Sequence, residues 1–372
     1  MRKLRKIPAF DGFRGVGVLI VLLAHLPMIE GATVYNAIWE VNQITRVGYI
    51  CLDIFFAISG FFITRLLLAE REATGRISFR LFYERRALRI FPVYYLTVFV
   101  CFFLFPMTTF SQVTLLTYTF NIYHPLTGMS NPMEHTWSLS VEEQFYFAWP
   151  FLIAFLPMRW LPILTLRVLP VIAVLSGLVI SWLVIGDDKA MSGNLVYMLP
   201  LTRMLSLSFG GWLAVREMQN RPFSGWICLV LVAVATVALV LDFYLKRAGI
   251  IASQGLYWTF ALACYGLISI GFAATLIFDE GRFASGLRRC LEFAPFRAMG
   301  QLSYAFYVFH LPVLYYFKIN DAALPTRTAP ALVVIEVIAI VFVLAILSHR
   351  FVEAPLMALR SRRPIQLAVA SK

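Results

Sequence analysis

The sequence predicts an all-α polytopic membrane protein with about ten transmembrane helices and both termini in the cytoplasm. Apolar residues make up 60% of its 372 residues and charged residues only 14%, whereas a soluble globular chain is about half apolar and a quarter charged. Long apolar stretches recur along the chain, and basic residues gather in every second segment between them. These observations exclude an ordinary soluble domain.

Ten stretches are long and apolar enough to cross a membrane. A helix that crosses a hydrocarbon core about 30 Å thick needs roughly 20 mostly apolar residues. The stretches that satisfy this requirement are 12–29, 48–69, 92–110, 137–157, 168–186, 194–215, 225–245, 255–278, 299–317 and 329–349. The segment 111–135 could form a short re-entrant helix. We reject a full crossing there, because it would destroy the charge asymmetry of the other segments.

The basic residues predict the orientation. Of the 32 lysines and arginines, 25 fall in the N-terminal segment and in every second segment after it, six fall in the other segments, and Arg203 lies inside a span. Cytoplasmic loops carry the Lys/Arg excess of membrane proteins. A formal net charge of +12 often indicates nucleic-acid binding, but here the distribution attributes it mainly to membrane orientation.

The chain is predicted to form one domain. Residues 1–358 make up the transmembrane domain and 359–372 a basic cytoplasmic tail, with no fused extracytoplasmic domain. The basic start runs into a long span without a small-residue cleavage site, so no removable signal peptide is predicted. The five cysteines show no paired spacing, and we expect no metal site and no tightly bound cofactor.

The first span carries the sharpest pair of polar residues, in FDGFRGVGVLIVLLAHLP. Arg14 and His25 share one helix face and lie roughly 16 Å apart along the axis. An arginine at the cytoplasmic mouth suits a phosphate or carboxylate, and a neutral histidine at depth suits proton transfer near neutral pH. A snorkelling arginine and a structural histidine are the alternative.

The fourth span begins with a polar and aromatic stripe, in which His135, Ser138, Glu142, Tyr146 and Trp149 recur at steps of three and four residues. Glu142 could be neutral, could orient the imidazole of the first span, or could share its proton. A structural hydrogen bond between helices is the alternative.

Two other spans carry polar candidates. Asp53 lies near the outer end of the second span, and Ser59 and Gly60 lie in its middle. Small residues are common at helix contacts, so packing is favoured there over a serine nucleophile. His310 and Tyr304 of the ninth span could line a cavity together, although a structural histidine is equally compatible.

Arginines near the membrane predict an anion site. Arg85, Arg86 and Arg89 cluster just before Pro92, which suits a helix start. Such a cluster indicates an anionic ligand on the cytoplasmic side, although topology alone explains some of these arginines. Arg203, well inside a span, needs a buried carboxylate or a ligand phosphate as its partner.

These segments together resemble the acyltransferase-3 family of integral-membrane O-acyltransferases. The matching stretches occur in order along essentially the whole chain: DGFRG with Arg14 and His25, DIFFAISGFFIT, RRALRIFP, HTWSLSVEEQFY, LSYAFYVFHLP and, more weakly, FVEAP. Each piece is modest alone, but the ordered set is specific. Cys51 replaces a usual glycine and Phe351 a common tyrosine, and both departures are peripheral.

The resemblance implies a multi-pass enzyme of the bacterial cytoplasmic membrane. Such an enzyme passes an acyl group, commonly acetyl, from cytoplasmic acyl-CoA to a hydroxyl of a saccharide or glycolipid. It also implies that Arg14 and His25 are required and that the Arg85, Arg86 and Arg89 cluster belongs to the donor side. Some relatives have an additional C-terminal domain that helps to deliver the acyl group. We expect none here, so either this chain or a separate protein acylates the acceptor.

The resulting hypothesis makes His25, oriented by Glu142, the general base toward the acceptor hydroxyl. Arg14, the arginine cluster and Arg203 hold the donor, and Tyr146 or Trp137 donates to the developing oxyanion. An acyl-His25 intermediate stays open. The rival functions are a proton-coupled transporter or flippase of envelope glycans and a noncatalytic partner in an envelope complex. The sequence shows no repeat that suggests a transporter's two halves.

Overall fold

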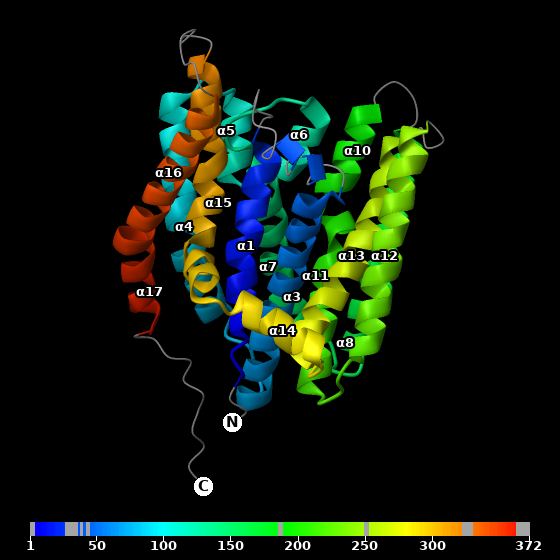
Figure 1. The fold of residues 1–372 in the computed structure, drawn as a ribbon. Helices are drawn as coiled ribbons and strands as arrows, with labels where there is room; N and C mark the ends of the chain where they lie inside the picture. The colour runs from blue at the N-terminus through cyan, green and yellow to red at the C-terminus, as the bar shows by residue number, and fades with distance from the viewer. Residues whose placement is uncertain are drawn as a thin grey trace.

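The computed structural model describes residues 4–26, 36–37, 40–41, 45–184, 189–248, 253–321 and 330–361. Within these residues the regular structure is entirely helical. Long helices that run alternately up and down form a bundle (Figure 1). They are α1 Pro8–His25, α3 Val47–Thr74, α4 Phe79–Leu104, α7 Trp137–Phe155, α9 Leu169–Leu183, α11 Pro200–Met218, α12 Gly225–Arg247, α13 Gln254–Phe278, α15 Ala294–Asp321 and α16 Pro330–Ser348.

Shorter helical segments connect or extend the long ones. A helical stretch made of α8 Leu161–Ile163 and the turn η2 Leu164–Val168 leads into α9, and the turn η3 His349–Glu353 leads from α16 into α17 Ala354–Ser361. The remaining short segments are α5 Thr109–Leu116, α6 Phe120–Thr127, η1 Glu134–Thr136, α10 Lys189–Met198 and α14 Arg282–Leu291.

The structure supports the absence of a span at 111–135. Helices α5 and α6 have 8 residues each, which corresponds to about 12 Å at 1.5 Å per residue. Neither helix can cross a hydrocarbon core.

Seven of the described segments are long and apolar enough to cross a membrane. They are Pro8–His25, Val47–Thr74, Phe79–Leu104, Leu161–Leu183, Gly225–Asp242, Gln254–Phe278 and Val334–Ala358. The other three predicted spans coincide with α7, α11 and α15, which are long but carry more polar side chains. A multi-pass helical protein is therefore supported, whereas the count of ten and the orientation stay predictions. Most of the predicted tail, from residue 362 onward, lies outside the described residues.

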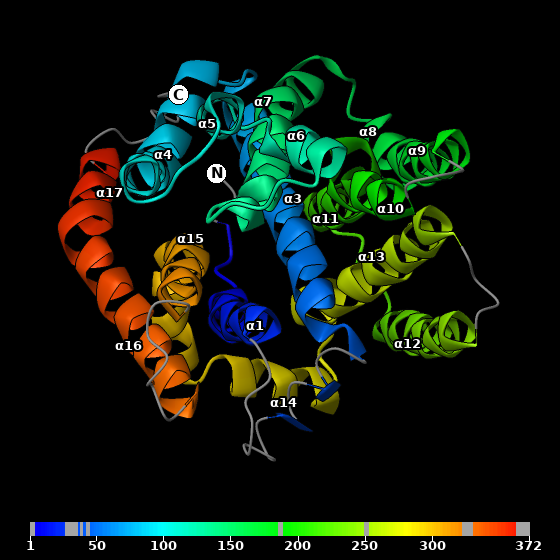
Figure 2. The same ribbon diagram turned by 90° about the horizontal axis from the view of Figure 1, so that it is seen from above.

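The two ends of the bundle differ (Figure 1). Helix α1 begins at the end where α14 and α17 lie, and we call this the α14 end. The opposite end carries α5, α6 and α10, and we call it the α6 end. Seen from above, α1 lies between α3 and α15, with α4 and α7 across the interior (Figure 2).

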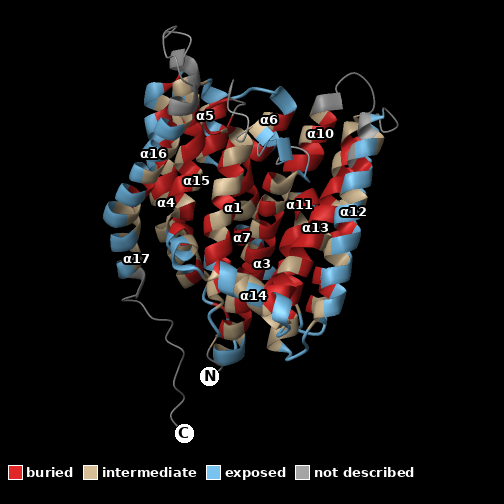
Figure 3. Ribbon diagram, in the orientation of Figure 1, coloured by how far each residue is buried: buried red, intermediate tan, exposed pale blue. Residues whose placement is uncertain are grey.

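Burial separates inner from outer helices (Figure 3). Much of α3, α11 and α13 is buried, whereas α12 and α16 expose apolar side chains such as Val237 and Val343. An apolar outer surface is the arrangement that a bilayer requires.

Helices α3 and α11 cross at close range because glycines lie at the contact. A Cβ atom at Gly60 would collide with the carbonyl oxygen of Leu207, and one at Gly210 would collide with the carbonyl oxygen of Ala57. The packing role predicted for Gly60 is therefore confirmed.

Candidate active site

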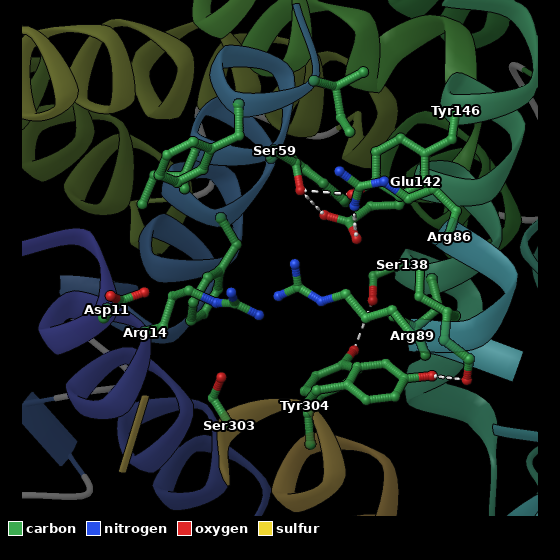
Figure 4. Close-up of a pocket in the computed structure, with 18 of the residues that line it drawn as sticks. Asp11, Arg14, Ser59, Arg86, Arg89, Ser138, Glu142, Tyr146, Ser303 and Tyr304 are labelled. Carbon is green, nitrogen blue, oxygen red and sulfur yellow. Dashed lines mark hydrogen bonds between the residues drawn. The ribbon is translucent and has the colours of Figure 1, made fainter. Parts of the chain in front are cut away.

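A cavity of about 400 Å³ lies toward the α14 end of the interior, among α1, α3, α4, α7 and α15 (Figure 4). The charged residues that line it are Asp11, Arg14, Arg65, Arg86, Arg89 and Glu142. We call it the basic cavity, because its arginines outnumber its carboxylates.

Three of these arginines are available to a ligand. Arg14 on α1 and Arg89 on α4 point toward each other from opposite walls, and Arg86 lies beside Glu142 (Figure 4). The Arg86 guanidinium stacks 4.8 Å from the centre of the Tyr146 ring. Within the described part of the chain, none of the three is hydrogen-bonded or ion-paired to another residue. Such groups suit an anion with several oxygens.

The fourth arginine of the cavity is already neutralised. Arg65 on α3 forms an ion pair with Glu217 at 2.6 Å and donates to the carbonyl oxygen of Arg5 at 2.7 Å. Arg65 therefore attracts an anionic ligand less strongly than Arg14, Arg86 or Arg89 does.

Glu142 is the centre of a hydrogen-bonded group inside the basic cavity. Ser59 donates to Glu142 Oε1 at 2.7 Å, and Tyr146 donates to Glu142 Oε2 at 3.1 Å. The hydroxyls of Ser59 and Tyr146 lie 2.7 Å apart. Both carboxylate oxygens of Glu142 thus have partners from α3 and α7, and neither partner is a histidine.

A second cavity, of about 250 Å³, lies toward the α6 end. Its lining includes His25, His124, His135, Tyr49, Trp137 and Tyr197. We call it the histidine cavity. Glu134 is the carboxylate among its described lining residues, which include no lysine and no arginine.

Three imidazoles meet beside the histidine cavity. The ring of His310 lies 5.1 Å from that of His25 and 4.7 Å from that of His135, measured between centroids. His25 Nδ1 is 2.8 Å from the carbonyl oxygen of Val21. A carbonyl oxygen only accepts, so Nδ1 carries the proton and Nε2 is the basic nitrogen of neutral His25. The contact of His310 Nδ1 with the carbonyl oxygen of Tyr307 assigns the same tautomer.

Leu52 and Tyr307 separate the two cavities, because both residues line both cavities. The Tyr307 hydroxyl donates to the carbonyl oxygen of His135 at 2.7 Å and lies 2.7 Å from Ser138 Oγ. These bonds hold α15 against the start of α7. The basic and histidine cavities are therefore neighbours across a thin wall.

Arg203 lies in neither cavity, contrary to its predicted role with the donor. It forms a buried ion pair with Asp53 at 2.7 Å, and Ser206 donates to the other oxygen of Asp53 at 2.6 Å. Arg203 also donates to the carbonyl oxygen of Tyr197 at 2.6 Å. The predicted partner is thus a carboxylate, and the pair joins α3 to α11.

The structure divides the other predicted residues between the cavities. The stripe faces the interior, with Ser138, Glu142 and Tyr146 of α7 at the basic cavity and His135 of η1 at the histidine cavity. Trp149 lies farther along the stripe and donates to Thr64 at 2.8 Å.

Glu142 and His25 line different cavities, so the prediction that Glu142 orients His25 is wrong. The carboxylate of Glu142 accepts hydrogen bonds from the hydroxyls of Ser59 and Tyr146 instead.

Two further groupings also need correction. All three arginines of the cluster line a small adjacent pocket, but Arg85 does not line the basic cavity, whereas Arg86 and Arg89 do. Tyr304 lines the basic cavity and donates to the carbonyl oxygen of Ile90 at 2.6 Å. His310 instead lies with the other histidines, because on helix α15 the six-residue spacing turns the two side chains to different directions.

Some lining residues were missed in the sequence. Asp11 and Tyr307 belong to matched stretches, DGFRG and LSYAFYVFHLP, but neither was predicted to line a cavity. Tyr307 lies within the matched stretch LSYAFYVFHLP, and its three-residue spacing from both Tyr304 and His310 was the available signal.

Comparison with known proteins identifies the family. The acyltransferase-3 family model, described as an acyltransferase domain, matches residues 7–350. The chain is 28% identical over 379 residues to the peptidoglycan O-acetyltransferase OatA of Listeria monocytogenes, covering 94% of this chain and 56% of that protein. It is 26% identical over 384 residues to the O-acetyltransferase OatA of Staphylococcus aureus, covering 95% and 57%.

A third relative agrees with the first two. The putative peptidoglycan O-acetyltransferase YrhL of Bacillus subtilis is 29% identical over 388 residues, covering 95% of this chain and 55% of that protein. The chain thus spans little more than half the length of these relatives. No solved structure matches it. The family match covers nearly the whole chain, and on that basis this chain belongs to the acyltransferase-3 family of membrane acyltransferases.

Proposed function

We propose that this chain is a membrane O-acetyltransferase that takes an acetyl group from cytoplasmic acyl-CoA and transfers it to a saccharide hydroxyl. The observation that carries the proposal is the pair of adjoining cavities. One offers three unpaired guanidinium groups, and the other contains His25 with its Nε2 as the basic nitrogen. The names of the relatives support acetyl as the group and a glycan of the cell envelope as the acceptor.

The basic cavity is the proposed donor site. Coenzyme A carries phosphates at one end and a thioester on a long, narrow arm. Arg14, Arg86 and Arg89 would bind the phosphates through charge-assisted hydrogen bonds. The arm would pass between Leu52 and Tyr307, which requires a side-chain movement at that wall, and deliver the thioester to His25.

His25 is the proposed general base. Its Nε2 takes the proton of the acceptor hydroxyl while the hydroxyl oxygen attacks the thioester carbonyl carbon. The carbon–sulfur bond then breaks, the ester forms, and the imidazolium returns the proton to the departing thiolate. Trp137 shares a cavity with His25 and can donate from its indole nitrogen to the oxyanion. Tyr146 shares no cavity with His25.

The test uses the purified full chain in lipid vesicles. We expect free coenzyme A to be released from acetyl-CoA only when a saccharide acceptor is present, with one ester formed for each thiol released. His25→Ala should abolish release while acetyl-CoA still binds. Near-normal turnover in that variant would refute the general base. Acceptor movement across the vesicle without thiol release would indicate a transporter instead.

A second experiment addresses the acceptor and the compartment. Mass spectrometry of envelope glycans from bacteria with and without the gene should show a loss of one acetyl mass per modified unit. Label retained on the protein from radioactive acetyl-CoA without acceptor would indicate an acyl-His25 intermediate.

A further inference from the structure

We propose that the histidine cavity is the acceptor site and that it binds one uncharged sugar ring, which enters from the α6 end. This inference rests on the proposed function, because it assigns the second substrate of the same reaction. The ligand is a neutral pyranose, held by His135 on one side and by an aromatic wall on the other.

The charge of the two cavities separates their ligands. The basic cavity has unpaired arginines and suits a polyanion. The described lining of the histidine cavity offers one carboxylate, imidazole and aromatic rings and tyrosine hydroxyls, with no lysine or arginine. An anionic ligand would have no counter-charge there, whereas a polyhydroxylated neutral ring needs only hydrogen bonds and apolar contact.

His135 provides the polar side of the site. Its side chain is 3% exposed and lines the cavity, yet neither ring nitrogen has a hydrogen-bond partner among the described residues. A neutral imidazole has one donor and one acceptor, and leaving both unpaired in the interior costs free energy. Neighbouring sugar hydroxyls both donate and accept, so two of them match the two nitrogens.

Tyr49, Trp137 and Tyr197 provide the apolar side. The ring centroids of Trp137 and Tyr197 are 4.8 Å apart, and those of Tyr49 and Tyr197 are 5.4 Å apart. The C–H groups of a pyranose pack favourably against such aromatic surfaces. A wall of aromatic rings with a few polar groups is typical of small-ligand sites.

The buried ion pair holds this wall in place. The Arg203 guanidinium lies 4.0 Å from the ring centre of Tyr197 and 5.0 Å from that of Trp137. Asp53 fixes Arg203 from α3. Arg203 is therefore a positioning residue. It lines neither cavity, but it holds the rings of Trp137 and Tyr197 that form the wall of the acceptor site.

The location suits the chemistry. His25 lines the same cavity as His135, so a ring bound there presents its hydroxyls to the proposed base. The volume of about 250 Å³ accommodates one ring at a time, with the rest of the glycan extending toward the α6 end.

The experiment measures equilibrium binding of two probes to the full chain in detergent. Chitotetraose, a neutral saccharide, and acetyl-CoA are titrated separately by calorimetry. His135→Gln should weaken chitotetraose binding about tenfold and leave acetyl-CoA binding unchanged. Arg89→Ala should do the reverse. His349→Gln, which removes a histidine that lines neither cavity, should change neither.

A second variant guards against misfolding. Tyr49→Ala removes a half-buried member of the wall and should also weaken chitotetraose selectively, with acetyl-CoA binding as the measure of an intact fold. Unchanged chitotetraose binding in both variants, or no chitotetraose binding by the unmodified chain, would overturn the acceptor site.

The two proposals fail in different ways. Chitotetraose binding that depends on His135 without any acceptor-dependent thiol release would refute the transferase and retain the sugar site. Thiol release whose acceptor KM is unaffected by His135→Gln would refute the sugar site and retain the transferase.

Discussion

Arg14 and Arg89 point toward each other across the basic cavity, and neither forms an ion pair with a carboxylate of the described residues (Figure 4). Like charges repel strongly where water is scarce. An anion bound between the two guanidinium groups would offset their mutual repulsion, which favours its binding. We predict that Arg89→Ala raises the KM for acetyl-CoA roughly ten- to a hundredfold, because a charge-assisted hydrogen bond contributes about 1.5–3 kcal/mol. The kcat should change much less, because the phosphates do not react.

The control for this prediction is Arg76→Ala. Arg76 is exposed in the segment between α3 and α4 and lines neither cavity, so its removal changes the net charge equally. Steady-state kinetics with varied acetyl-CoA should show a normal KM. An equal rise of the KM in Arg76→Ala and Arg89→Ala would show that the net charge of the protein, and not a specific donor site, attracts acetyl-CoA.

Glu142 gives a second prediction at the scale of residues. Removing its carboxylate leaves the hydroxyls of Ser59 and Tyr146 without their shared acceptor, which costs about 1–3 kcal/mol for buried polar groups. Glu142→Ala should therefore lower the thermal unfolding midpoint, and the loss should be smaller when Ser59→Ala is already present. Differential scanning fluorimetry in detergent measures both.

The same residue distinguishes two accounts of His25. Glu142→Gln should leave the pH profile of acetyl transfer in place, because Glu142 contacts Ser59 and Tyr146 and not the imidazole. A displaced acidic limb in that profile would restore the orienting role predicted from the sequence.

The limits of prediction show clearly in Glu142 and Arg203. Helical periodicity places Glu142 on the inward stripe of α7, and that placement is correct. Whether it meets His25 depends on the depth and rotation of α7 relative to α1, which packing sets and periodicity does not contain. Arg203 and Asp53 are 150 positions apart, so the need for a partner was predictable but the choice between a carboxylate and a ligand was not.

At the scale of elements, hydropathy locates helices better than it bounds them. The predicted span 48–69 corresponds to α3, which continues to Thr74. The additional turns carry Arg71, which donates to the carbonyl oxygens of Ile153 and Leu156 at 2.6 and 2.8 Å and so satisfies the end of α7. Apolar composition ends with the membrane, whereas hydrogen bonding to neighbours decides where a helix ends.

The crossing of α3 and α11 gives a prediction for these elements. Gly60→Ala should lower the thermal unfolding midpoint and the yield of folded protein, because the new methyl group meets the backbone of Leu207 and overpacking costs about 1–3 kcal/mol or more. Gly286→Ala is the matched control, since nothing lies near a Cβ on that glycine of α14. It should be neutral or slightly stabilising. An unaffected Gly60→Ala would show that the two helices can separate freely.

At the scale of the whole molecule, the two cavities lie toward opposite ends of one bundle. Arginines predicted to be cytoplasmic line the first, and His25, His124 and His135 line the second. The pattern of apolar stretches and arginines predicts which end is cytoplasmic, because that pattern depends only on composition along the chain. The wall of Leu52 and Tyr307 between the cavities depends on how α3 and α15 pack, which composition does not determine.

The polarity can be tested with a cysteine of the chain itself. Cys290 on α14 is exposed, whereas Cys51, Cys101, Cys228 and Cys264 are buried. If the α14 end is cytoplasmic, a membrane-impermeant maleimide should label Cys290 in inverted membrane vesicles and leave intact spheroplasts unlabelled. Cys290→Ser should abolish the signal. Met129→Cys in the Cys290→Ser background, at the exposed α6 end, should give the opposite pattern. Labelling of Cys290 in intact spheroplasts would show that the α14 end faces the outside of the cell. The arginines of the basic cavity would then lie away from cytoplasmic acyl-CoA, which would refute both the orientation and the donor site.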